Sequence, residues 1–205
     1  AVIMGTAILL SVIGAGMVVA ASCGTRATAL GLQGRVAESL ALYRTAAGLD
    51  PLSPEYRLGQ AFSLDILADS GNPGLRAESW RQADRALALA PHDPNIRVLY
   101  GAFALRNWAF ERAIREYDKA LELHPFEISR YRELGGASFL AGQVLVHEGK
   151  PEARAYLLKA VAVTERLAAR AEKGAPLTNP VPAILAIESA RVAAEPEAER
   201  APPAP

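Results

Sequence analysis

Three stretches of the sequence carry the same four marked positions at identical spacing. Each has a small residue, then an apolar one, then an alanine and finally a proline, at offsets of four, three and five residues. The first three positions share one face of a helix, and proline ends that helix because it lacks an N–H and clashes with the preceding turn. The copies are Ser39, Tyr43, Ala46 and Pro51; Ser79, Ala83, Ala86 and Pro91; and Ala113, Tyr117, Ala120 and Pro125.

The spacing between copies indicates the type of repeat. Pro91 and Pro125 are 34 residues apart, which is the period of the tetratricopeptide repeat (TPR), a helical hairpin. Pro51 and Pro91 are 40 apart, and the six extra residues include the turn sequence Gly71-Asn72-Pro73-Gly74. A fourth copy has Ala153, Leu157 and Ala160, with Glu165 at the proline position and its own extra residues near 148–151. We therefore predict an all-α fold, a TPR helical-hairpin solenoid of about three repeats plus flanking helices.

The chain begins with an apolar run that has no polar face. Residues 1–25 contain no charged side chain, and the first is Arg26. About 20 apolar residues at roughly 1.5 Å each match the hydrocarbon core of a bilayer. A fully apolar helix inside a soluble domain would need neighbours on every side, and the rest of the chain is amphipathic. We predict one transmembrane helix, or a signal anchor, over residues 1–22, which would bring the lipid bilayer in as a partner.

A second interpretation of this run centres on Cys23. The small residues before this lone cysteine resemble a bacterial lipoprotein processing site, although Ala20 stands where leucine is usual and no basic stretch comes before the run. Lipidation of Cys23 thus stays open beside a plain membrane helix. Arg26 and Arg35 favour a cytoplasmic array by the positive-inside rule, whereas a lipoprotein or an uncleaved signal anchor would place it outside. The expected location is a bacterial inner (plasma) membrane, with the side left open.

Composition argues against several classes of function. Lys+Arg and Asp+Glu are 22 each, so no strong positive field would attract nucleic acid. One cysteine excludes a disulfide framework, and the three histidines have no metal-ligand spacing on a helix face. No Gly-rich phosphate loop follows a strand. We expect no catalytic, metal or cofactor site, no cofactor and no enzymatic activity in these residues.

The function of a TPR array is expected on its concave face, lined by the first helix of each repeat. The ligand would be a protein or peptide, held as a helix or an extended segment on a mixed apolar surface. The TPR clamp for chaperone carboxyl tails uses lysines and asparagines at these positions. This face has only one asparagine, Asn95, and one basic residue, Arg132, so that ligand is disfavoured. The predicted face comprises Glu55, Leu58, Phe62, Asp65, Asn95, Val98, Ala102, Leu105, Ser129, Arg132 and Phe139.

The arrangement resembles the C-terminal end of bacterial O-antigen ligase/polymerase-like membrane proteins, in which a last transmembrane helix is followed by a short, degenerate TPR array. The resemblance rests on the join of the apolar run to residues 42–51, on residues 53–58, and on Leu123-His124-Pro125-Phe126 followed by Tyr131. It implies a parent protein that transfers or polymerises lipid-linked glycans, with its catalytic residues upstream of this chain. The chain itself would be a non-catalytic, partner-binding tail.

The predicted organisation follows from these segments. Residues 1–22 form the membrane helix, 23–34 a juxtamembrane connector and 35–165 the TPR array. Residues 166–194 form a helical extension, and the Pro/Ala/Glu-rich residues 195–205 a disordered tail. Two alternatives to the glycan-assembly tail remain. One is a stand-alone anchored or lipidated TPR adaptor, and the other is a soluble TPR partner whose apolar start is buried.

Overall fold

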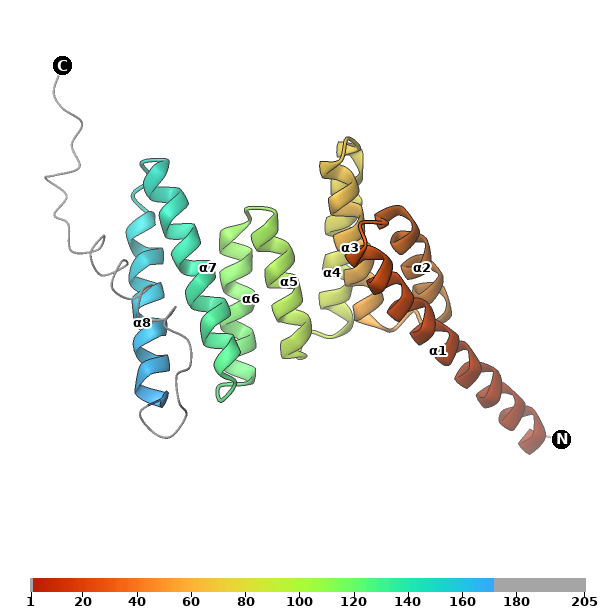
Figure 1. Ribbon diagram of the computed structural model, residues 1–205. Coiled ribbons are helices and arrows are strands. Elements are labelled where there is room, and N and C mark those ends of the chain that lie inside the picture. The colour runs from red at the N-terminus through yellow and green to blue at the C-terminus, as the bar shows by residue number, and fades with distance from the viewer. Residues whose placement is uncertain (1, 172–205) are drawn as a thin grey trace, which may run out of the picture. The chain divides into compact units, whose positions relative to one another are not determined.

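A computed structural model describes residues 2–171, with side chains from residue 14 to residue 170. The described part is helical, without strands (Figure 1). The helical extension predicted for residues 183–194 and the tail 195–205 lie outside it. The elements are α1 (Val2–Leu32), α2 (Val36–Leu49), α3 (Pro54–Asp69), the 3₁₀ turn η1 (Pro73–Leu75), α4 (Arg76–Leu89), α5 (Pro94–Arg106), α6 (Phe110–Leu123), α7 (Ile128–His147) and α8 (Ala153–Ala171).

The chain divides into two compact units, Ala1–Phe103 and Ala104–Pro205, with the division inside α5. In the first unit α1 packs on α2, α2 on α3, and α3 on α4. In the second unit α6 packs on α7, and α7 on α8. The predicted hairpins α1–α2 and α3–α4 thus lie in the first unit, and the predicted hairpin α7–α8 lies in the second.

The repeated small residues are buried in the core, which confirms the interpretation of the pattern. Short side chains on this face let paired helices approach closely, and dense packing then excludes water. The prolines also mark the predicted helix ends, because α2, α4 and α6 each end two residues before a proline. The residues buried in this way are Ser39, Ala46, Ser79, Ala83, Ala86, Ala113, Tyr117, Ala120, Ala153, Leu157 and Ala160.

Of the two insertions expected between the helices of their hairpins, the first lies there at least in part, whereas the second lies mostly within a helix. The first forms the loop and 3₁₀ turn that lead into α4 at Arg76. The second mostly lengthens α7, which has 20 residues where α5 has 13. Helix α8 then continues through residue 165, where the array was predicted to end, to Ala171.

Helix α1 joins the apolar run to the first hairpin. Ala20, Gly24, Ala27 and Leu30 are buried and spaced as one helix stripe, and α1 packs on α2. Residues 23–32 of the predicted connector are thus a packed helix, continuous with the run before them. Among the described residues, no helix is long and apolar enough to cross a membrane. Of the predicted membrane segment 1–22, the side chains of residues 1–13 lie outside that search.

Candidate functional site

A pocket of about 350 Å³ opens between α1, α2 and α3, entirely within the first unit. No charged side chain lines it. Three of its four hydroxyl groups are engaged locally: Thr28 Oγ1 lies 2.8 Å from Tyr43 Oη, and Ser39 Oγ donates to the Ala27 carbonyl at 2.8 Å. What remains open is mainly carbon, which suits an apolar side chain. The lining residues are Thr28, Gly31, Leu32, Val36, Ser39, Tyr43, Gly59, Phe62, Ser63 and Ile66.

Two glycines shape this pocket. A Cβ on Gly59 would lie 2.4 Å from the Tyr43 ring, so glycine is what allows that ring to cross α3. A Cβ on Gly31 would lie 3.4 Å from Ser39 Oγ, a tight but ordinary approach. Phe62 stands beside them, half-buried, with its ring edge-to-face with Phe103 at 5.5 Å between centroids. The pocket is therefore a fixed feature of helix packing rather than of loop conformation.

Phe62 is the one residue of the predicted concave face that lines this pocket. Gly59 and Ile66 share its helix face and could have been found from the helical period, three residues before it and four after it. The pocket residues of α1 could not have been found in this way, because Thr28 and Gly31 were assigned to a connector. Tyr43 was predicted only as a packing residue of the repeat.

Two predicted face residues are buried, which corrects their assignment to an open surface. Leu58 is 2% exposed and Asp65 is fully buried. The Asp65 carboxylate accepts a hydrogen bond from Arg76 at the start of α4, and Arg76 also pairs with Asp69. Asp65 thus anchors the α3–α4 hairpin. Glu55 is exposed and accepts from Ser53 Oγ at 2.7 Å.

The remaining predicted face residues divide between the units. In the first unit Asn95 is exposed at the start of α5, and Val98 and Ala102 are half-buried. The second unit carries four more, of which Arg132 is exposed and three are half-buried. The hydroxyl of Ser129, one of these three, donates to the Glu127 carboxylate at 3.0 Å. Their role in binding stays a prediction. The three half-buried residues of the second unit are Leu105, Ser129 and Phe139.

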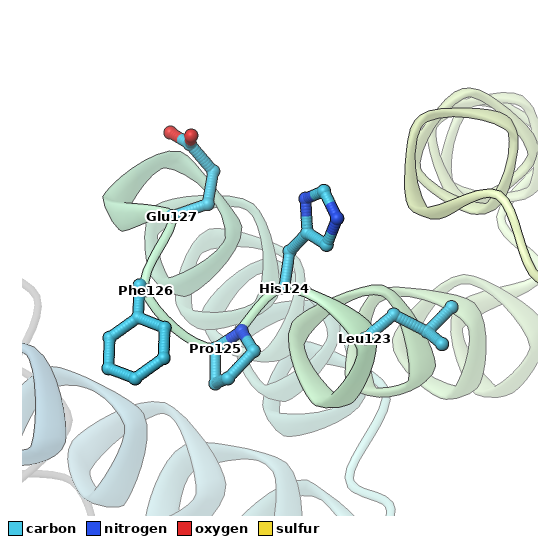
Figure 2. Close-up of a pocket in the computed structure, with 5 residues that line it drawn as sticks. All are labelled: Leu123, His124, Pro125, Phe126 and Glu127. Atoms are coloured by element: carbon cyan, nitrogen blue, oxygen red, sulfur yellow. The ribbon is translucent and has the colours of Figure 1, made fainter.

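A second hollow, of about 450 Å³, lies at the α6–α7 turn (Figure 2). It is lined by Leu123, His124, Pro125, Phe126 and Glu127, and Phe126 is 86% exposed. The Arg170 guanidinium of α8 lies 5.2 Å from the Phe126 ring centroid and donates to the Pro125 carbonyl at 2.5 Å. Figure 2 shows Phe126 and Pro125 on one side of the turn and Glu127 on another. This turn is bound to α8 and presents no converging polar groups.

The surroundings of Tyr117 and Glu127 shift the pKa of each side chain. Burial, with a smaller contribution from the Glu133 carboxylate, raises the pKa of Tyr117 to about 12. Hydrogen bonds from Ser129 lower the pKa of the exposed Glu127 carboxyl. No cluster of three or more His, Cys, Asp or Glu residues in the described part could hold a metal ion. Cys23 has a free thiol and is half-buried within α1.

Comparison with known proteins bears on the fold. No family model matches the chain, and no curated protein matches it. Among solved structures, pilF of Pseudomonas aeruginosa is 19% identical and covers 88% of this chain and 79% of its own, with a TM-score of 0.50. The first TPR of Spaghetti (RPAP3), bound to the HSP90 peptide SRMEEVD, is 21% identical over 63% of this chain and 95% of its own, with a TM-score of 0.48. The MamA protein is 16% identical over 92% and 100%, also with a TM-score of 0.48. Taken with the 34-residue period and the buried small-residue face, the similarity to pilF shows that the chain has the tetratricopeptide repeat fold.

Proposed function

We propose that this chain is a membrane-tethered scaffold that binds a protein partner, with an apolar side chain of the partner inserted between α1, α2 and α3. The supporting observation is the uncharged pocket of about 350 Å³ beside Phe62. Three of its four hydroxyl groups are already hydrogen-bonded and no charged side chain lines it, so a charged ligand group would lose hydration there with little compensation. An aliphatic or aromatic anchor would lose only unfavourable contact with water.

Peptide display on the immobilised full-length chain tests this proposal. We expect selected peptides to share one large apolar residue. Their binding should fall about tenfold or more in Phe62→Ala, since anchor contacts dominate such interfaces. Gly31→Met should also block binding, because its side chain would occupy the pocket while methionine remains a good helix former. Phe126→Ala, at an exposed turn of the other unit, is the matched control. Selected peptides that bind Gly31→Met and Phe62→Ala as well as the native chain would refute the proposed site.

The proposed tether is supported by the exposed end of α1. Met17, Val18 and Val19 are 53%, 71% and 51% exposed, and they belong to a stretch of 25 residues without charge. Such a surface in water carries a hydrophobic cost that a bilayer removes. The full chain made in bacteria should resist extraction by alkaline carbonate, and Val18→Glu should weaken that resistance. Complete release of the native chain by carbonate would argue against the tether.

We further propose that the scaffold is the non-catalytic C-terminal part of an O-antigen ligase/polymerase-like protein of the bacterial inner membrane. The proposal depends on the order of an apolar helix followed directly by a short TPR array. An immunoblot of native membranes with antibody against residues 94–125 separates it from the alternative. A band far above the mass of 205 residues supports a larger glycan-assembly parent. A band at that mass supports a stand-alone or lipidated adaptor.

A further inference from the structure

A third pocket, of about 310 Å³, lies where α2 joins α3 and α4 ends. It is lined by Pro51, Arg57, Arg85, Ala88 and Leu89. Two of these five side chains are guanidinium groups and none is acidic. Among the described residues, neither Arg57 nor Arg85 has an ion pair or a hydrogen bond. The pocket therefore combines two guanidinium groups, neither of them in an ion pair within the described residues, with an apolar floor of Pro51, Ala88 and Leu89.

The residues at the position of Arg57 in later repeats do form hydrogen bonds, so the lack of one at Arg57 is not a general property of this turn. Arg97 stands six residues after Pro91, as Arg57 does after Pro51, and it donates to the Pro91 carbonyl. Tyr131 stands six residues after Pro125, and its hydroxyl donates to the Pro125 carbonyl at 3.0 Å. Both later residues bind the carbonyl of the turn. Arg57 does not, and its guanidinium is left for another acceptor.

Two acidic residues close in the chain to α4 and its turn have other partners. Asp84, next to Arg85 in the chain, accepts a hydrogen bond from the Tyr100 hydroxyl at 2.7 Å. Asp93 accepts from the backbone N–H of Asn95 at 2.7 Å and so caps α5. Each of these acids has a structural partner of its own.

The pocket lies at the end of the first unit from which the apolar part of α1 projects. Helix α2 returns along α1 after a short turn, and its 14 residues reach back about 21 Å at roughly 1.5 Å per residue. The start of α3 is close to the same level of α1, because a Cβ on Gly24 would lie 2.5 Å from the Tyr56 ring. Figure 1 shows the N-terminal part of α1 continuing beyond the packed helices. Leu52, in the turn beside Pro51, is 75% exposed.

We infer that Arg57 and Arg85 bind a phosphate group in this pocket, carried either by a lipid headgroup or by a free phosphorylated solute. Guanidinium groups present several N–H donors to tetrahedral oxyanions, and such charge-assisted hydrogen bonds are stronger than neutral ones. The position of the pocket beside the apolar helix makes an anionic headgroup a natural source. Only that source rests on the proposed membrane tether.

The test follows the Nε–Hε resonances of Arg57 and Arg85 in the ¹⁵N-labelled full chain. In neutral detergent, inorganic phosphate is titrated at constant ionic strength with chloride as the balancing anion. We expect saturable shifts of both resonances and none of Arg44, an exposed arginine of α2. Arg57→Gln and Arg85→Gln should each weaken binding about tenfold or more, since each removes a charge-assisted contact. Arg44→Gln is the matched control and should change nothing.

A second arm replaces phosphate with nanodiscs of phosphatidylcholine, with or without phosphatidylglycerol. Shifts that require phosphatidylglycerol and both arginines assign the site to a lipid headgroup. Shifts with inorganic phosphate alone assign it to a free solute. The absence of shifts in both arms, or shifts of Arg44 equal to those of Arg57, overturns the inference. Failure of the chain to enter nanodiscs would contradict the tether, and the phosphate arm would then decide the site alone.

Discussion

The charge pair between Arg76 and Asp65 holds the α3–α4 hairpin together and leads to an asymmetric prediction. The Asp65 side chain is fully buried, whereas the Arg76 side chain is 38% exposed and also pairs with Asp69. Removing Arg76 leaves a buried carboxylate without its guanidinium counter-charge. Removing the charge of Asp65 leaves a guanidinium that water and Asp69 can still accommodate. The two substitutions should therefore differ in cost although they break the same pair.

The magnitudes follow from this difference in burial. Arg76→Met should destabilise the chain by about 3–5 kcal/mol, the usual cost of leaving one member of a buried pair. Asp65→Asn keeps the volume of the side chain and one oxygen that can accept a hydrogen bond from Arg76, and it should cost about 1–1.5 kcal/mol. The double variant Asp65→Leu with Arg76→Met should recover about 2 kcal/mol relative to Arg76→Met alone, because it leaves no buried charge.

Urea unfolding, followed by circular dichroism in neutral detergent, measures these differences. With a slope of about 2 kcal/mol per molar, Arg76→Met should lower the midpoint by about 2 M and Asp65→Asn by less than 1 M. Hydrogen exchange should show that the loss of protection is centred on residues 54–89. An Asp65→Asn variant as destabilised as Arg76→Met would refute the reasoning, since the argument depends on which partner is buried.

Three further predictions test packing, backbone strain and titration. Gly142→Ala places a Cβ 2.6 Å from Leu157 Cγ and should cost about 1–3 kcal/mol in urea unfolding, whereas Gly136→Ala, with nothing within 4 Å, should not destabilise. Trp108 has φ of 58° and is 65% exposed, so Trp108→Gly should stabilise the chain by about 1 kcal/mol, and a loss would contradict this. The pKa of Tyr117, raised to about 12, favours the neutral phenol in the folded state, so its stabilisation is complete below pH 10 and is lost as pH rises toward 12. Tyr117→Phe should remove up to about 2 kcal/mol of that pH dependence, measured as the difference between unfolding midpoints at pH 9 and pH 12.

The fold was predictable because its information is carried by short, repeated distances along the chain. Offsets of four and three place Ala113, Tyr117 and Ala120 on one helix face, and proline after such a face ends the helix. No knowledge of long-range contacts is needed for either step. The structure buries all three side chains, as it does the small residues of the other copies. A single amphipathic helix does not show which helix it packs against. The repeated spacing does, because it identifies the helices as members of one array.

The candidate site was less predictable because it depends on partners that helix period does not identify. Phe62, Leu58 and Asp65 lie within two turns of one another, yet Phe62 borders a pocket and the other two are buried. The Asp65 carboxylate pairs with Arg76 at the start of α4, a residue 11 positions away in the chain. The Tyr43 ring of α2 reaches the pocket by crossing α3 at Gly59. Such contacts join residues that no local spacing relates.

The continuity of α1 carries the last step of the argument. Its 31 residues contain no proline, and the buried stripe of Ala20, Gly24 and Ala27 begins directly after the exposed Met17, Val18 and Val19. A single helix therefore serves both as the apolar run and as the first helix of the array. Because an unbroken helix bends little over this length, the direction of residues 2–19 fixes the direction in which the first hairpin stands. A bilayer that held the apolar run would thereby set the height of the Arg57–Arg85 pocket and of the Phe62 pocket above its surface, without any linker that could vary either one.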